Sequence, residues 1–172
     1  GHPSTIHHWW ARRPLAACRA ILFASVVDDP DSPDANINFV NLCKSLPRMR
    51  NASELDTPRQ RLFDFIEQLV IWENTTNTEI NELAQKLIET SNPEGTPWVF
   101  DPFAGSGAIP LEAQRLGLRS IASDLNPISV LINKALLEIP QKFSNTNPMN
   151  PQSRIEQLGS IWKGAQGLAE DV

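Results

Sequence analysis

The stretch WVFDPFAGSGAIPLEA, residues 98–113, sets an aspartate and two glycines between an apolar strand and an expected helix. Gly105 and Gly107 allow the backbone to turn tightly and to approach a ligand with no side chain in the way. The start of the helix offers free N–H groups and the positive end of a dipole, which favour a carboxylate or a phosphate. Turns of this kind bind phosphates, nicotinamide dinucleotides or S-adenosylmethionine.

Two of these three ligands fit the sequence poorly. A phosphate-binding P-loop has lysine and then serine or threonine after its second glycine, whereas Ala108 and Ile109 follow Gly107 here, and this excludes a P-loop. A dinucleotide-binding turn has a third glycine for close packing of helix on strand, and Pro110 stands at that position. The proline disfavours NAD and FAD without excluding them, and a purely structural turn is a further alternative.

S-adenosylmethionine accounts for two acids as well as the glycines. Asp101 comes directly after the first strand, where it can face the ammonium group of the methionine tail. Asp124 ends the second strand about 20 positions later, the separation at which an acid accepts ribose hydroxyls in a βαβ unit. We therefore expect S-adenosylmethionine as the cofactor, with both aspartates among its ligands.

Alternating strands and helices surround these residues. Apolar stretches predict strands at 98–100 and 118–123, and helices are expected at 108–116 and 128–138, with Gly117 as a left-handed C-cap. Strands that alternate with helices pair in parallel through right-handed crossovers. We predict an α/β fold with a partial Rossmann-like sheet, a parallel βαβ unit and an inserted helical region.

The sequence before residue 98 is helical in pattern. Thr57 with Gln60, and Thr76 with Glu79, form capping boxes at the starts of two helices. Helices are expected at 14–27, 57–72 and 76–91, with a short one at 38–45 and a weak one at 153–168. We divide the chain into an N-terminal segment and helix (1–27), a helical insertion (28–97), a βαβα core (98–140) and a loop with a C-terminal helix (141–172), all within one domain.

Composition narrows the class of protein. The chain has 172 residues and a net charge of −5, whereas a domain that binds nucleic acid through its own surface is usually basic. The two cysteines, Cys18 and Cys43, lie in no CxxC spacing, which argues against a disulfide framework and a zinc ribbon. The cluster of His2, His7 and His8 lacks the usual zinc partners, so no metal is expected. No apolar run reaches membrane-spanning length, and we expect a cytoplasmic protein.

Three motifs together resemble a family. DPFAGSG, residues 101–107, resembles the cofactor motif of the amino-group DNA methyltransferases, the adenine-N6 and cytosine-N4 enzymes, and SDLNP, residues 123–127, resembles their second motif. HPSTIHHWWARRPLAA, residues 2–17, is similar to a segment that in many of these enzymes contacts the methionine end of the cofactor. The chain resembles large bacterial and archaeal proteins described as adenine-specific DNA methylases that carry an N-terminal domain of unknown function.

The resemblance implies an S-adenosylmethionine-dependent methyltransferase fold and a role for each matching residue. The turn would line the methionine and the adenosine, Asp124 would hold the ribose, Leu125 would pack on the adenine, and Asn126 would shape that loop. The N-terminal segment would close the methionine end. The implied cofactor-binding residues are Asp101, Pro102, Phe103, Ala104, Gly105, Ser106, Gly107, Asp124, Leu125, Asn126, His2, Ser4, Thr5, Arg13 and Pro14.

The family's catalytic tetrapeptide, [D/N/S]-P-P-[Y/F/W], is absent from these residues, because no two prolines are adjacent. In related enzymes this tetrapeptide holds the flipped base and accepts hydrogen bonds from its amino group. The chain starts with Gly1, and the catalytic motif can follow the cofactor motif in chain order, so we expect a segment of a larger protein with that motif beyond Val172. DNA would be a partner of the full-length protein, and the segment alone would be inactive.

Two other functions stay open. Guanine-N2 methyltransferases of RNA carry a stretch similar to DPFAGSGAIPLEA, although they lack the N-terminal segment. A catalytically inactive module that binds only a cofactor or a partner is the third interpretation. Trp9 and Trp10 could stack on nucleobases, although a bulky pair ahead of a helix is more typical of packing. Arg12 and Arg13 could contact a carboxylate or a DNA phosphate, or could be solvated.

Overall fold

The fold is known from a computed structural model, which describes residues 8–47 and 56–143. His2, Ser4 and Thr5, and the helix predicted at 153–168, lie outside these residues. In chain order the elements are α1 (Leu15–Val26), α2 (Ile37–Ser45), α3 (Pro58–Leu69), the 3₁₀ helix η2 (Trp72–Thr76), α4 (Thr78–Ser91), β1 (Trp98–Asp101), α5 (Ala108–Arg115), β2 (Arg119–Ala122), α6 (Pro127–Asn133), the π-helical turn η3 (Lys134–Glu138) and α7 (Ile139–Phe143).

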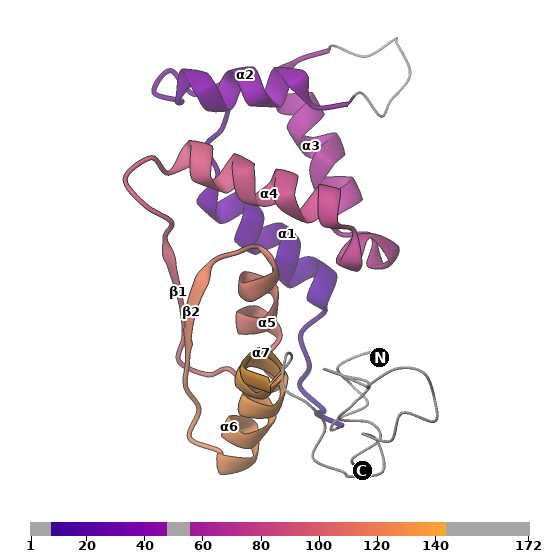
Figure 1. The fold of residues 1–172 in the computed structure, drawn as a ribbon, viewed down its shortest axis with the longest axis vertical. Coiled ribbons are helices and arrows are strands. Elements are labelled where there is room, and N and C mark those ends of the chain that lie inside the picture. The colour runs from indigo at the N-terminus through magenta and orange to yellow at the C-terminus, as the bar shows by residue number, and fades with distance from the viewer. Residues whose placement is uncertain (1–7, 48–55, 144–172) are drawn as a thin grey trace, which may run out of the picture.

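The two strands pair in parallel, and α5 makes the crossover between them. Trp98 lies opposite Arg119 and Asp101 opposite Ala122, so both strands end at the same edge of the sheet. Figure 1 shows β1 and β2 side by side, with α5 beside them and α6 beyond their carboxyl ends. The predicted parallel βαβ unit is confirmed, and the chain has a mixed fold of helices and a small parallel sheet.

The starts of the helices follow from local side chains, with one correction. The hydroxyl oxygen of Thr57 accepts a hydrogen bond from the N–H of Gln60, which caps α3 as predicted. At α4 the capping residue is Asn77 and not Thr76, because the Asn77 side chain accepts from the backbone of Glu79 and Ile80. Asn77 caps α4 in place of Thr76 because Thr76 is still part of the 3₁₀ helix η2.

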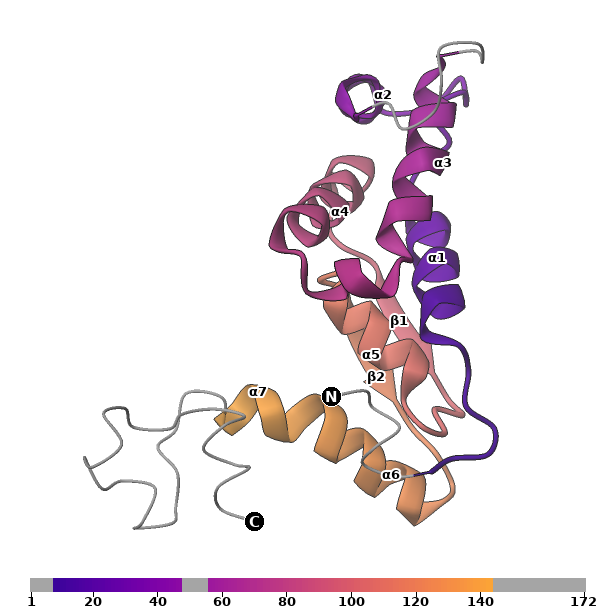
Figure 2. The ribbon, with the colours of Figure 1, turned by 90° about the vertical axis from the view of Figure 1, so that its right-hand side faces the viewer.

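The main hydrophobic core lies between α1, α2, α3 and α4, and the C-terminal end of α5 packs against it. Phe23, Phe39, Leu69 and Leu87 are fully buried there, and Leu116 joins them at the end of α5. In Figures 1 and 2 the helices α2, α3 and α4 stand at one end of the molecule and the strands with α6 at the other. α1 contacts α3 and α4 and also α5, so it connects the helical region to the strand unit.

A buried ion pair joins the helical region to the strand unit. The Arg19 guanidinium on α1 lies 2.5 Å from the carboxylate of Glu112 on α5, and both side chains are almost completely buried. Arg19 also donates to the Leu69 carbonyl oxygen at 2.8 Å and to the Thr75 hydroxyl at 3.2 Å. These partners satisfy the guanidinium away from water, which a buried charge requires.

Candidate cofactor site

The predicted glycine turn forms a tight loop after β1. Gly105 has φ +52° and Gly107 has φ +78°. Residues other than glycine rarely adopt this left-handed conformation. The Gly107 N–H donates to the Ala104 carbonyl at 2.8 Å, and the Phe103 N–H donates to the Asp101 carboxylate at 3.1 Å. Asp101 is buried, and the hydrogen bond that its carboxylate accepts fixes the start of the loop.

Asp124 ties the end of β2 to the same loop. One carboxylate oxygen accepts from the Gly105 N–H at 2.8 Å, and the other accepts from the Asn126 N–H at 2.8 Å. The hydrogen bonds from the backbone of Asn126 and Gly105 hold the pKa of this carboxyl below its ordinary value, because they favour the charged form. The structure therefore brings together the second acid and the glycine turn, which are 19 residues apart.

Two side chains of helix α6 fix the carbonyl group of Gly105. The Ser129 hydroxyl donates to the Gly105 carbonyl oxygen at 2.6 Å, and the Asn133 amide donates to the same oxygen at 3.0 Å. Sequence reasoning missed both residues. Their spacing of four positions places them on one face of a helix, and that polar pair in an otherwise apolar stretch was the available signal.

Asn133 also limits what can stand at position 107. A Cβ atom added to Gly107 would lie 2.5 Å from the Asn133 amide oxygen, closer than such atoms approach. This oxygen is the one buried side-chain polar atom without a hydrogen-bond partner among the described residues. Its amide nitrogen is held by Gly105 and by the Ser129 carbonyl, so the oxygen stays turned toward Gly107.

Two apolar side chains beside the loop point into solvent. Phe103 is 78% exposed and Leu125 is 95% exposed. Asn126, next to Leu125, caps α6 by accepting from the Ile128 N–H at 3.0 Å. The exposed positions of Phe103 and Leu125 leave both available to cover an apolar or aromatic part of a ligand.

The described part of the N-terminal segment reaches the glycine loop. A Cβ atom on Gly105 would lie 3.2 Å from the indole nitrogen of Trp9, so this tryptophan sits against the loop backbone. Sequence reasoning gave Trp9 no role in the site. Pro14 is the N-cap of α1, and Arg13 before it is exposed. The structure thus places the start of α1 near the turn, while the roles of Arg13 and Pro14 stay predictions.

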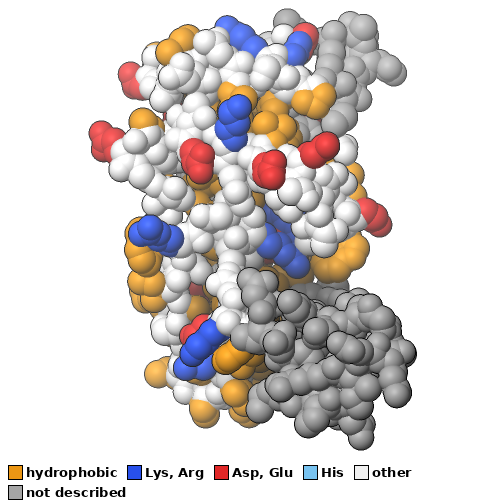
Figure 3. Space-filling view, in the orientation of Figure 1, with side chains coloured by type: hydrophobic (Ala, Val, Ile, Leu, Met, Phe, Trp, Pro, Cys, Tyr) orange, Lys and Arg blue, Asp and Glu red, His pale blue; other side chains and the backbone are white. Residues whose placement is uncertain are grey.

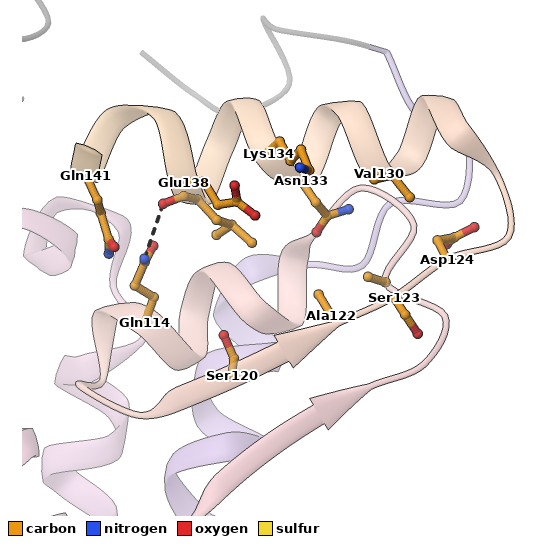
Figure 4. Close-up of a pocket in the computed structure, with 12 residues that line it drawn as sticks. Gln114, Ser120, Ala122, Ser123, Asp124, Val130, Asn133, Lys134, Glu138 and Gln141 are labelled. Carbon is orange, nitrogen blue, oxygen red and sulfur yellow. Dashed lines mark hydrogen bonds between the residues drawn. The ribbon is translucent and has the colours of Figure 1, made fainter. Parts of the chain in front are cut away.

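A polar cavity of about 310 Å³ adjoins the loop, between β2, α5 and the helices α6–α7. In Figure 4 the labelled residues come from the helices α6–α7 on one side of this space and from α5, β2 and the residues that follow β2 on the other, with Asp124 at one end and Gln141 at the other. Gln114 closes part of it by donating to the Leu137 carbonyl oxygen at 3.5 Å. Of the described residues that were predicted to bind cofactor, only Ala104 and Asp124 are among those lining the cavity.

Three further features of the described residues concern metal ligands, the cysteine thiols and the length of the apolar helices. Within residues 8–47 and 56–143, no three His, Cys, Asp or Glu side chains gather as metal ligands would. Burial raises the pKa of the Cys43 thiol to about 11, and burial, followed by the charge of Glu112, raises that of Cys18. In the same described residues no helix is both long and apolar enough to cross a membrane.

Comparison with protein families agrees with this geometry. The family model described as "Protein of unknown function (DUF1156)" matches residues 1–63. The model of the D12 class N6 adenine-specific DNA methyltransferases matches residues 78–166, more than half of the chain, and the match includes the glycine loop and Asp124. No curated protein and no solved structure matches the chain. The chain belongs to the D12 class N6 adenine-specific DNA methyltransferase family.

Proposed function

We propose that this chain supplies the S-adenosylmethionine-binding part of a DNA methyltransferase that acts on the N6 amino group of adenine. The observation that carries the proposal is the 2.8 Å hydrogen bond between the Gly105 N–H and the Asp124 carboxylate. It joins the glycine turn and the acid at the end of the next strand, the two features that hold a nucleoside in an open parallel sheet. The family match supports methyl transfer to DNA.

The side chains around the loop fit the parts of this cofactor. The Asp124 carboxylate accepts the N–H groups of Gly105 and Asn126, and in the bound state it would also accept the two ribose hydroxyls. Leu125 and Phe103 would cover the adenine, and Asp101 would face the ammonium group of the tail. The loop and the first turn of α5 offer backbone N–H groups to the tail carboxylate.

The contribution of this chain is to bind and orient the cofactor. The bound cofactor would supply an electrophilic methyl group on its sulfonium. Asp124 binds the N–H of Gly105, and Ser129 and Asn133 bind its carbonyl oxygen, so the loop is preorganised before any ligand arrives. The 172 residues contain no [D/N/S]-P-P-[Y/F/W] sequence, and we expect this chain alone to bind cofactor without transferring a methyl group.

Calorimetric titration with S-adenosylhomocysteine, the demethylated product, tests the proposal. We compare the native chain with Asp124→Asn, which keeps an acceptor oxygen but removes the charge, and with Asp34→Asn in an exposed loop as the control. A hydrogen bond to a charged group is worth about 1.5–3 kcal/mol, so Asp124→Asn should weaken binding roughly 10- to 150-fold. Absence of binding, or equal affinity of all three proteins, would refute the proposed function.

Methylation assays on duplex DNA and on ribosomal RNA test the substrate. These assays use the protein in its full-length form with labelled S-adenosylmethionine. We expect label in the DNA, at the N6 position of adenine. Label in the RNA at guanine N2 would instead support the alternative enzyme class, and binding of cofactor without label in either would support the inactive module.

A further inference from the structure

The two tryptophans that precede α1 have different surroundings. Trp9 lies against the backbone of Gly105, as its 3.2 Å approach to that position shows. The Trp10 ring is stacked on Trp9, with ring centroids 5.4 Å apart and planes 7° from parallel, yet Trp10 remains 83% exposed. Packing therefore explains Trp9 but leaves one face of Trp10 open to solvent.

The chain is locally basic in sequence around this pair, which favours an anionic partner. From residue 8 to residue 27 the chain contains arginines but no acid, although the whole chain is acidic. Arg12 and Arg13 follow Trp10 directly, and Arg13 is exposed. In the view of Figure 3 most visible acidic side chains lie over the helices α2–α4, away from the end that carries α6. Exposed aromatic rings in a basic stretch of chain are typical of surfaces that bind unpaired nucleic acid.

We propose that Trp10, supported from behind by Trp9, is a stacking platform for an unpaired base of DNA next to the cofactor loop. The inference rests on the proposed function, because only a DNA-methylating protein has reason to receive an unpaired base there. Enzymes that modify a base take it out of the helix and lose its stacking on neighbouring bases. The Trp10 ring replaces part of that stacking at a point that Trp9 fixes against Gly105.

The chain offers a matched tryptophan on another surface. Trp98 is 60% exposed on the face of the sheet that points away from α5, where the Arg119 guanidinium lies 5.5 Å from its ring centroid. Both tryptophans are thus exposed. Trp98 has an arginine in contact with its ring, and Trp10 has arginines close to it in the sequence. Only Trp10 adjoins the glycine loop, so Trp98→Ala controls for the loss of any exposed tryptophan.

Fluorescence anisotropy with a labelled single-stranded DNA oligonucleotide tests the platform, without cofactor. Base–aromatic stacking implies that Trp10→Ala weakens binding about fivefold or more. Trp10→Phe should retain most of the affinity, because a smaller ring still stacks, and Trp98→Ala should bind as the native protein does. The dependence of affinity on salt should be the same in Trp10→Ala as in the native protein, since no phosphate contact is removed.

Four results with nucleic acid and one with the cofactor product would overturn the proposal. The four are no binding of the oligonucleotide by the native protein, equal affinity of Trp10→Ala, an equal loss in Trp98→Ala, and tighter binding of an RNA of the same sequence. A loss of S-adenosylhomocysteine affinity in Trp10→Ala would also overturn it, because the ring would then belong to the cofactor site. Failure of the proposed function is distinguishable, since it appears in the cofactor titration of the native protein.

Discussion

The helical region, α1 to α4, and the glycine-loop region, β1 to α6, are held together by different forces. The first buries large apolar side chains such as Phe23, Phe39 and Leu87 in one core. In the second, the loop is fixed by hydrogen bonds to its backbone, while Phe103 and Leu125 remain in solvent. A loop that is fixed by hydrogen bonds to its backbone can keep its shape while exposed apolar side chains such as these stay available for a ligand.

The comparison separates residues that support the site from residues that form it. Hydrophobic burial is nondirectional and tolerates small shifts, so it suits a scaffold. The hydrogen bond that Asp124 accepts and those that Ser129 and Asn133 donate are directional, and they define the positions of the N–H and C=O of one residue, Gly105. We therefore expect substitutions in the first region to lower stability, and substitutions in the second to lower ligand affinity at a smaller cost in stability.

The ion pair between the two regions should show one of the largest effects. Arg19→Ala leaves the buried Glu112 with Arg115 as an ion-pair partner but removes the Arg19 pair and its hydrogen bonds to Leu69 and Thr75, and we expect a loss of about 3 kcal/mol in the free energy of unfolding. The control is Arg59→Ala, whose ion pair with Asp29 is nearly half exposed and is worth roughly 1 kcal/mol or less. Urea denaturation measures both. Similar losses in the two variants would mean that the regions are not joined through Arg19.

Two leucines compare the regions directly. Leu87→Ala removes a completely buried side chain from the core, so we expect a loss of about 2–5 kcal/mol in unfolding free energy. Leu125→Ala removes an exposed side chain and should change stability by roughly 0.5 kcal/mol or less, while weakening S-adenosylhomocysteine binding. Denaturation and calorimetry on both proteins check this. Unchanged cofactor affinity in Leu125→Ala would contradict its place in the site.

Two glycines sharpen the role of Asn133. Gly107 has φ +78° and Gly95 has φ +130°, both unusual for residues with a side chain, so alanine at either position costs about 1–3 kcal/mol in backbone strain. Only at Gly107 does the added Cβ meet the Asn133 oxygen, whereas nothing lies within 4 Å at Gly95. Gly107→Ala should therefore be the more destabilising change in thermal unfolding, and adding Asn133→Ala should recover part of the difference. Equal effects at both glycines would exclude the steric role of Asn133.

The pKa of Asp124 predicts the smallest effect. Backbone hydrogen bonds lower it from the ordinary value of 3.8, so the folded carboxyl holds its charge more strongly than the unfolded one. Its contribution to stability is complete above the ordinary value and is lost as the pH falls through the folded value. The stability difference between the native chain and Asp124→Asn should therefore be constant above about pH 5 and shrink below pH 4. A difference that grows on acidification would contradict this assignment.

Local signals in the sequence predicted the local structure well. The order of strands and helices, the Thr57 cap and the left-handed Gly117, with φ +74°, follow from short-range rules. The long-range contacts left no such signal. Arg19 and Glu112 are 93 residues apart, and Asn133 reaches a carbonyl 28 residues earlier, so only the folded chain reveals these partners. The helix predicted at 128–138 also continues further, through a π-helical turn into α7.

A crystal structure of the chain with S-adenosylhomocysteine tests the central claim most directly. We predict the ribose hydroxyls within hydrogen-bonding distance of the Asp124 carboxylate, the tail over residues 103–107, and the adenine against Leu125. Density for the ligand at another place, or a preference of the loop for a nicotinamide dinucleotide, would contradict the account.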